Sequence, residues 1–526
     1  MKKEKQMTVP PGTDASFNPP GNWKAIDWMA IRQQVRRLQV RIAKATQLGK
    51  HRRVSALQWL LTHSRAAKLL AVWRVTTNRG AKTPGVDNVV WRTNKQKFQA
   101  AENLKRHGYR PKPLRRLYIP KKNGKLRPLS IPTMHDRAMQ ALYALALAPV
   151  AETLADPNSY GFREGRCCAD ALTHAHIVLS RQHSPQWVLE GDIRACFDEI
   201  SHAWLLQHVP MDKQILRKWL KAGYWEKAKL FPTSSGTPQG GIASPILANL
   251  ALDGMEQAIR QAVAKKGDKV NFVRYADDFI VTGATTELLE QKVKPALTAF
   301  LTPRGLALSE QKTVITHIGK GFNFLGHTVR KYGDKLLTRP AKSSVKALQD
   351  KIGLCIHAAL GLSQEALLRK LNPLIRGWAN YYRHGAAKRT FDRLDYYVYW
   401  RLWRWATRRH PNKSVRWKVR KYFSAAGKRG LFSVRLSQGE SPIQVFTLYR
   451  AASTTIQRHI KVRGAANPYD PHYAQYFEQR RRSGWRVRNG NGNATTPRTD
   501  TQPRIVKHWL ADAAACFHQK VAVGEA

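Results

Sequence analysis

Residues 270–283 read VNFVRYADDFIVTG, and they constrain the fold more than any other stretch of the chain. Two apolar, β-prone runs, 270–275 and 279–282, flank a short polar break, so the stretch predicts a β-hairpin with Asp277 and Asp278 at its bend. Adjacent carboxylates repel each other and are costly to desolvate, so a cation is their natural partner. An ordinary acidic turn on the surface is the alternative interpretation.

A third carboxylate follows another predicted strand. Asp192 closes the apolar run 187–193. Two cations bridged by aspartates can activate an attacking hydroxyl and stabilise a leaving pyrophosphate, and such a site needs a carboxylate at a strand end. A lone Asp at a strand end is more often the N-cap of a helix. Together with the Asp277–Asp278 turn, Asp192 favours a metal site.

The charge of the chain indicates its partners. Ninety Lys and Arg against 35 Asp and Glu give a formal net charge of +55. Such an excess is self-repelling unless a polyanion neutralises it, so nucleic acid is the favoured partner and an anionic membrane a poor second. No apolar run approaches the length of a membrane span.

The cysteines and the N-terminus bear on the compartment. The five cysteines are scattered and form no C-x-x-C pair, which argues for a reducing compartment and against a structural zinc site. Residues 1–22 are polar and lack the apolar core of a signal peptide, so we expect a disordered lead-in and a cytoplasmic protein.

Two further stretches could contact a nucleotide. Residues 109–132 predict a basic β-hairpin in which Lys125 and Arg127 lie two apart on one strand and face the same side. Such a pair could hold a triphosphate, or could protect an exposed sheet edge. In the Gly/Pro turn of residues 236–250, Gln239 offers a donor and an acceptor where small residues permit close approach, although a plain helix entry is the alternative.

The C-terminal half is helical and basic. Residues 344–360, 364–383 and 390–409 have helical patterns separated by stop and start signals, so we expect a three-helix unit. Between residues 401 and 439 there are twelve Lys and Arg and no acid, interleaved with aromatic residues. We expect the apolar edges of the aromatic residues to pack in the helix core and the basic face to contact folded RNA.

The blocks KLRPLSIP, YGFR, DIxxCFD, TPQGG, YADD, ExKT and FLG occur in this order. Their set resembles the successive motifs of reverse transcriptases, and more narrowly those of the reverse transcriptase–maturases encoded within group II introns. RGWANYY, at 376–382, is similar to part of that family's maturase domain. The resemblance covers residues 25–480.

The resemblance implies an α+β right-hand polymerase, with fingers and palm built on a mixed sheet, followed by an all-α thumb. It divides the chain into a lead-in at 1–22, a helical extension and the start of the fingers at 23–110, fingers and palm at 111–340, thumb and maturase domain at 341–440, a DNA-binding-like region at 441–482, and a low-order tail at 483–526.

Carried over to this sequence, the resemblance implies that Asp192, Asp277 and Asp278 coordinate two Mg²⁺ ions, with help from the backbone carbonyl of Ile193. Lys312 is similar to a lysine near the triphosphate that protonates the leaving pyrophosphate. The substrates implied are deoxynucleoside triphosphates, joined by attack of a primer 3′-hydroxyl on the α-phosphate.

The resemblance also assigns nucleotide and primer contacts. Lys125 and Arg127 would contact the triphosphate, and Gln239 would lie by the nascent base pair. Phe197 resembles the ring that excludes a ribose 2′-hydroxyl, although a packed core Phe is the alternative. The remaining assignments are Arg163 and Arg166 to the template backbone, Phe324, Leu325 and Gly326 to the primer, and Arg404, Arg408, Arg409 and Arg416 to intron RNA.

The predicted function is RNA-directed DNA synthesis combined with binding and splicing of the protein's own group II intron RNA, which is copied into target DNA during retrohoming. A maturase with a dispensable polymerase and a bacterial reverse transcriptase in a non-intron role are the alternatives. Relatives often carry a zinc-braced HNH endonuclease. Cys516 and His518 are too few for that site, so we expect no zinc and a missing or truncated endonuclease.

Overall fold

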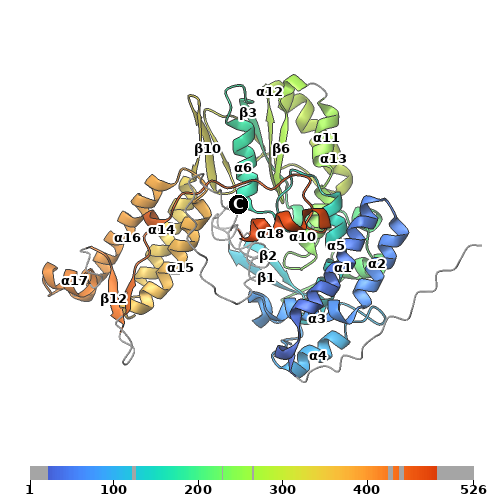
Figure 1. Cartoon of the computed structure of the whole chain (residues 1–526), viewed down its shortest axis with the longest axis horizontal. Coiled ribbons are helices and arrows are strands. Elements are labelled where there is room, and N and C mark those ends of the chain that lie inside the picture. Colours follow the sequence, from blue (N-terminus) through green and yellow to red (C-terminus); the bar gives the residue numbers. More distant parts are fainter. Residues whose placement is uncertain are drawn as a thin grey trace, which may run out of the picture.

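The computed structural model describes residues 22–120, 126–227, 229–263, 266–424, 430–436 and 444–482. A sheet with its helices lies at the top of Figure 1, the N-terminal helices pack below it at the lower right, and a helical arm extends to the left. Among the described residues, no helix is long and apolar enough to cross a membrane. The predictions for the lead-in, for Lys125 and for the tail at 483–526 lie outside the described residues.

The N-terminal unit consists of α1 (Trp28–Gln47), α2 (His51–His63), α3 (Arg65–Thr76) and α4 (Asn94–Glu102). The apolar residues at helical spacing are buried against α5 (Met134–Leu154), which is itself buried along most of its length. This confirms the helical pattern expected after residue 23.

The fingers contain a four-stranded sheet in the order β2-β1-β4-β5. β1 (Leu114–Pro120) and β2 (Leu126–Ile131) are the antiparallel pair predicted from the sequence. β4 (Tyr224–Glu226) runs parallel to β1 and forms a hairpin with β5 (Lys229–Phe231).

The palm sheet has the order β6-β7-β3-β8, and all its neighbours are antiparallel. Its strands are β3 (Trp187–Asp192), β6 (Asn271–Tyr275), β7 (Asp278–Gly283) and β8 (Val314–His317). Successive side chains of a strand point to opposite faces. Both faces are buried, since Val188 and Ile280 join one apolar cluster and Leu189 and Val281 join another.

Helices cover both faces of this sheet. α6 (Cys168–Leu179) contributes to the first cluster, and α13 (Lys294–Leu301) contributes to the second. The shorter helices of the fingers and palm are α7 (Cys196–Glu199), α8 (His202–His208), α9 (Lys213–Leu220), α10 (Ser244–Leu252), α11 (Met255–Ala262) and α12 (Thr286–Leu288).

A three-stranded sheet joins the palm to the helical arm. It contains β9 (Phe322–Phe324), β10 (His327–Tyr332) and β11 (Lys335–Pro340). The arm then folds as α14 (Lys342–His357), α15 (Gln364–Tyr382) and α16 (Lys388–Arg409), around an apolar cluster of its own. These helices confirm the three-helix unit, and they are followed by α17 (Val415–Tyr422) and the hairpin of β12 (Ser433–Leu436) and β13 (Gln444–Thr447).

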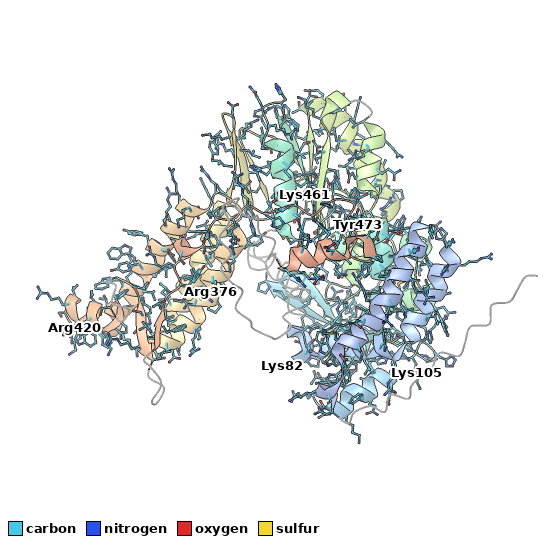
Figure 2. The ribbon with its side chains drawn as sticks, viewed as in Figure 1. Lys82, Lys105, Arg376, Arg420, Lys461 and Tyr473 are labelled. Carbon is cyan, nitrogen blue, oxygen red and sulfur yellow. The ribbon has the colours of Figure 1, made fainter. Side chains whose placement is uncertain are left out.

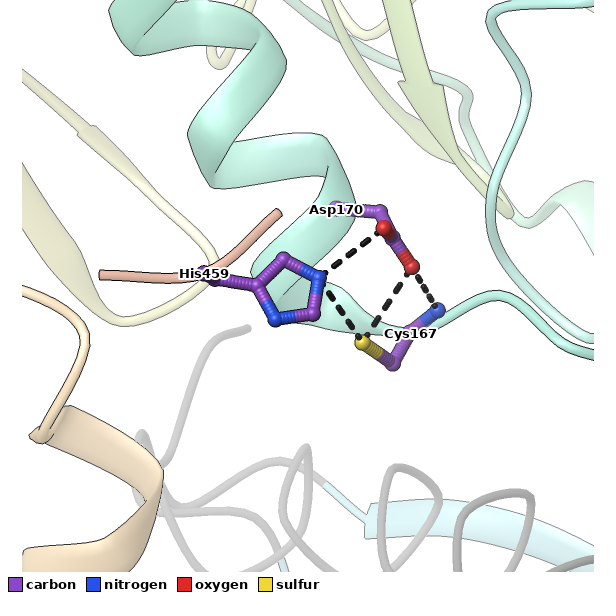
Figure 3. Close-up of side chains that lie close together, drawn as sticks. All are labelled: Cys167, Asp170 and His459. Carbon is purple, nitrogen blue, oxygen red and sulfur yellow. Dashed lines mark hydrogen bonds and ion pairs between the residues drawn. The ribbon is translucent and has the colours of Figure 1, made fainter. Parts of the chain in front are cut away.

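After the arm, the chain returns to the palm and ends its described part in α18 (Ala474–Arg482) (Figure 1). The fully buried carboxylate of Asp170 anchors this return (Figure 3). It accepts hydrogen bonds from His459 Nε2 at 2.9 Å, the backbone N–H of Val462 at 2.7 Å and Arg480 at 3.2 Å, while Cys167 Sγ lies 3.3 Å from its other oxygen. Burial alone raises the pKa of Asp170, but His459, Arg480 and the Val462 N–H outweigh it and lower that pKa.

Candidate active site and nucleic-acid surface

Two of the three predicted metal-binding aspartates face each other across the palm sheet. Asp192 ends β3 and is the direct partner of Asp278, which begins β7. Directly opposed residues of antiparallel strands project to the same face, with Cβ atoms about 4.5–5.5 Å apart. Asp277 precedes Asp278 in the two-residue turn after Tyr275, where Ala276 has a left-handed φ of 58°. The structure thus places all three carboxylates at one end of one sheet.

Two glycines make room for this turn and strand end. A Cβ on Gly191, just before Asp192, would lie 2.1 Å from the ring of Phe279, and a Cβ on Gly161 would lie 2.3 Å from the backbone N of Ala276. Both distances are too short for any side chain. Gly161 follows Tyr160, whose N–H donates to the carbonyl of Arg274 at 2.9 Å. The YGF motif is therefore needed to support the turn that carries Asp277.

A segment from outside the sheet closes the site. The Ser309 N–H donates to the carbonyl of Asp192 at 2.8 Å, and the Arg194 N–H donates to the carbonyl of Ala307 at 2.9 Å. These two bonds lie on either side of Ile193 and do not use its carbonyl. The same segment brings Lys312 to the site, where its Nζ is 3.4 Å from Asp192 Oδ2.

The donor set fits divalent cations. Three carboxylates gathered in a chain of net charge +55 supply the hard oxygen ligands that Mg²⁺ prefers. The donor set therefore suits divalent cations, and the two-cation site stays a prediction.

The predicted nucleotide contacts gather on the turn that follows β3. Phe197 is half-buried, its ring lies edge-on to Phe162 at 6.3 Å, and its carbonyl accepts from the Thr237 N–H at 2.6 Å. Gln239 is tied to this turn, because its Nε2 donates to Asp198 Oδ2 at 2.7 Å. The structure thus brings Phe197 and Gln239 together.

The fingers are fastened to the same loop. The Ser130 N–H at the end of β2 donates to the carbonyl of Gln239 at 2.8 Å. Loss of water around its carboxylate raises the pKa of Asp198, and the guanidinium groups of Arg116 on β1 and Arg127 on β2 act in the opposite direction. The sequence analysis assigned no role to Asp198, even though the residue closes the DIxxCFD block.

The predicted template contacts of Arg163 and Arg166 are wrong. Both guanidinium groups are buried and form ion pairs with Glu152, at 2.7 Å and 3.4 Å. Arg163 also donates to the carbonyls of Asp156 and Ser159, and Arg166 donates to those of Gly464 and Ala466. Since a buried charge needs a partner, these arginines hold the core together and do not reach a template.

The predicted primer-contacting turn is mostly internal. Phe324 and Leu325 are buried, and Leu325 and Gly326 have left-handed φ angles of 48° and 72°. From α15, the Tyr381 hydroxyl donates to the Leu325 carbonyl at 2.9 Å, and the Tyr382 hydroxyl donates to the Gly326 carbonyl at 3.1 Å. The turn couples palm to arm, and its side chains are not available to a primer.

The arm carries the predicted basic surface. Arg404, Arg408, Arg409 and Arg416 are all exposed. Trp405 is buried and donates its indole N–H to the Ala359 carbonyl at 3.0 Å, whereas Tyr396 is 67% and Trp400 43% exposed. Figure 2 shows Arg420 at the outer end of this arm. The aromatic residues therefore divide between core and surface, as the sequence analysis expected.

Comparisons with known proteins agree with this geometry. Residues 23–104 match the N-terminal domain of reverse transcriptase, residues 119–329 match reverse transcriptase (RNA-dependent DNA polymerase), and residues 345–423 match the maturase-specific domain of group II introns.

Three individual relatives match between 48% and 63% of the chain. The group II intron-encoded protein LtrA of Lactococcus lactis subsp. cremoris is 30% identical over 427 residues, which are 63% of this chain and 70% of the relative. Protein YkfC of Escherichia coli (strain K12) is 34% identical over 304 residues, 48% of this chain and 78% of the relative. An uncharacterized 91 kDa protein in the cob intron of Schizosaccharomyces pombe is 27% identical over 378 residues, 56% of this chain and 46% of the relative.

Proposed function

Because the chain belongs to the group II intron-encoded proteins, with their reverse transcriptase and maturase functions, we propose that it extends DNA on its own intron RNA at Asp192, Asp277 and Asp278. The observation that carries this proposal is the direct pairing of Asp192 with Asp278 beside the Asp277 turn.

The three aspartates would hold two Mg²⁺ ions, assisted by the Ile193 carbonyl. The bound ions would supply activation of the primer 3′-hydroxyl and stabilisation of the pyrophosphate. Lys312, beside Asp192, would hold and donate the proton that the leaving pyrophosphate takes up. Its exposed ammonium can move from the aspartate to a substrate.

The turn after β3 would bind the deoxynucleoside triphosphate. Phe197 would close the space needed by a ribose 2′-hydroxyl, and Gln239 would lie by the new base pair. Arg127 on β2 would contact the phosphates, and Lys125 would join it. The hydrogen bonds from Gln239 to Asp198 and from Ser130 to Gln239 support this arrangement, because they join the fingers to the palm beside the proposed nucleotide site.

In splicing, the protein would stabilise the catalytic fold of the intron RNA. The exposed arginines of α16 and α17 supply phosphate contacts, and exposed Tyr396 and Trp400 supply stacking surfaces. Copying of the intron into target DNA during retrohoming would follow. Arg458, Arg463 and Arg481, which are exposed on the segment that returns to the palm, are the residues we propose to contact this DNA.

Primer extension on an RNA template tests the proposal. With a DNA primer, deoxynucleotides and Mg²⁺, the parent protein should extend the primer, and Asp277→Asn should abolish extension while retaining RNA binding and splicing. Asp334→Asn is the matched control, because Asp334 is exposed in the turn of a neighbouring hairpin.

Three results would contradict all or part of the proposal. Extension by Asp277→Asn at the parent rate would exclude the metal site. Equal loss of extension and of splicing would exclude separate roles for the palm and the RNA-binding surface. Splicing by a parent protein that extends no primer would favour a maturase without a working polymerase.

A further inference from the structure

A pocket of about 230 Å³ lies among α2, α3, α5 and the loop after α4, away from the palm aspartates. Its floor is apolar and buried, and is formed by Leu104, Met139, Leu142 and Tyr143. Pockets for drug-sized ligands typically occupy about 300–1,000 Å³. This pocket therefore suits a smaller group with an apolar body.

The rim of the pocket is basic. It includes His63, Lys68, Lys105, Arg106 and His107. Burial lowers the pKa of Lys68, and the nearby ammonium of Lys105 lowers it further. Two cations held close together attract an anion. Figure 2 shows Lys105 beside the N-terminal helices, far from Arg420 on the arm.

Lys68 and Lys105 are the rim residues that we expect to bind an anion, because the charge of Arg106 is paired with a carboxylate. Among the described ion pairs, Arg106 is the rim residue that has a carboxylate partner, and this partner is Asp212. Asp212 also accepts from the backbone N–H groups of Gln214 and Ile215 at the start of α9. The Arg106–Asp212 pair thus fixes the loop next to Lys105 and contributes little net charge.

A stacking surface adjoins the rim. The rings of Trp59 and His63 are stacked with centroids 4.2 Å apart and an interplanar angle of 24°, and Trp59 is 56% exposed. His63 Nδ1 is 2.8 Å from the Trp59 carbonyl, which assigns the proton to this atom and leaves Nε2 for a ligand. An exposed indole beside basic groups is typical of single-stranded RNA binding.

We propose that this pocket takes the base of one unpaired nucleotide of the bound RNA, while Lys68 and Lys105 contact its flanking phosphates. The apolar floor receives the flat base, and Trp59 stacks on the next base along the strand. The inference rests on the RNA binding of the proposed function and adds a second contact region, on the side of the molecule opposite the arm.

Photocrosslinking to the full-length protein tests this site. A ten-nucleotide single-stranded RNA containing 4-thiouridine should crosslink to peptides covering residues 59–68 and 104–107. Lys68→Met/Lys105→Met should remove these crosslinks and reduce the slope of log K against log salt by about 1.4, since each phosphate contact on single strands contributes about 0.7. Lys95→Met/Lys292→Met, at two exposed lysines outside the pocket, should leave both unchanged.

An abasic RNA of the same length tests the base. If the base enters the pocket, the parent protein should bind the abasic strand more weakly, and Lys68→Met/Lys105→Met should discriminate less between the two strands. Crosslinks confined to other regions, or equal binding of the two strands, would overturn the inference. The proposed function would still hold if the protein extended a primer and bound RNA through the arm. Failure of the parent protein to bind any RNA would overturn both.

Discussion

Lys312 Nζ lies 3.4 Å from Asp192 Oδ2, although 120 residues separate the two in the chain. The pairing of β8 with β3, and the bond from the Ser309 N–H to the Asp192 carbonyl, bring them together. The contact is half-exposed, so it holds the lysine at the site without fixing it there permanently. This arrangement gives Lys312 a position from which to serve the leaving pyrophosphate.

Replacing Lys312 should therefore slow chemistry more than binding. Lys312→Ala should reduce the single-turnover rate of nucleotide incorporation by about 10²–10⁴-fold, the usual contribution of a positioned proton donor. Rapid-quench measurements at saturating nucleotide report this rate directly.

Lys312→Arg distinguishes proton transfer from charge. Arginine keeps the positive charge but does not give up its proton, so a rate as low as that of Lys312→Ala identifies a proton donor. Recovery of the parent rate by Lys312→Arg would show that only the charge beside Asp192 matters.

Phe197 should determine the choice between deoxyribose and ribose. Phe197→Ala opens space beside the proposed sugar position and should reduce the preference for deoxynucleotides over ribonucleotides by about 10–200-fold, the range for a steric pocket contact. Steady-state incorporation of matched dNTP and rNTP pairs measures the ratio. Phe162→Leu removes the same ring contact from the other side, so a similar loss of preference in that variant would assign the effect to packing.

The exposed arginines of the arm should determine the salt dependence of RNA binding. Arg404→Gln/Arg408→Gln/Arg416→Gln should lower the slope of log K against log salt by about 2–3, because each phosphate contact contributes about 0.7–0.9. The control triple variant, Arg92→Gln/Arg110→Gln/Arg217→Gln, removes equal charge from exposed sites outside the arm. Equal slopes for the two triple variants would show that the arm has no specific role.

Local sequence patterns predicted the hairpin of β6 and β7 and the three helices of the arm. The alternation of apolar residues defines the first, and capping residues and helical spacing define the second. Ser363, for example, ends the preceding turn and caps α15 with its side chain. These features depend on near neighbours in the chain, so a sequence read in order reveals them.

Ion pairs between residues far apart in the chain could not be predicted from local sequence patterns. The resemblance assigned Arg163 and Arg166 to the template backbone, but the buried carboxylate of Glu152 on α5 pairs with both. Asp170 and His459 meet across 289 residues. A sequence names the charged residues but not their partners, and burial of a charge is decided by the partner.

Two buried histidines, His174 and His327, and the half-buried His384 should make stability decline in mild acid. Burial is the main cause that lowers the pKa of His174, His327 and His384 to about 4 in each case. In an unfolded chain, the pKa of histidine is about 6.5. Between these values the unfolded state binds protons that the folded state does not, so the contribution of each histidine is complete above about pH 6.5 and is lost as the pH falls toward 4.

His174 offers the clearest test, because its Nδ1 lies 3.1 Å from the hydroxyl of Tyr160, which belongs to the apolar cluster of Val188 and Ile280. Near pH 5, the unfolded parent protein binds almost one more proton at His174 than the folded protein does. His174→Gln removes this difference, so it should reduce the slope of unfolding free energy against pH by about 1.2 kcal/mol per pH unit. Tyr160→Phe removes the hydrogen bond but keeps the titrating ring, so it should lower stability without changing that slope. Urea unfolding between pH 4.5 and 6.5 measures both quantities. An unchanged slope in His174→Gln would mean that the folded palm admits a charged imidazole at this position.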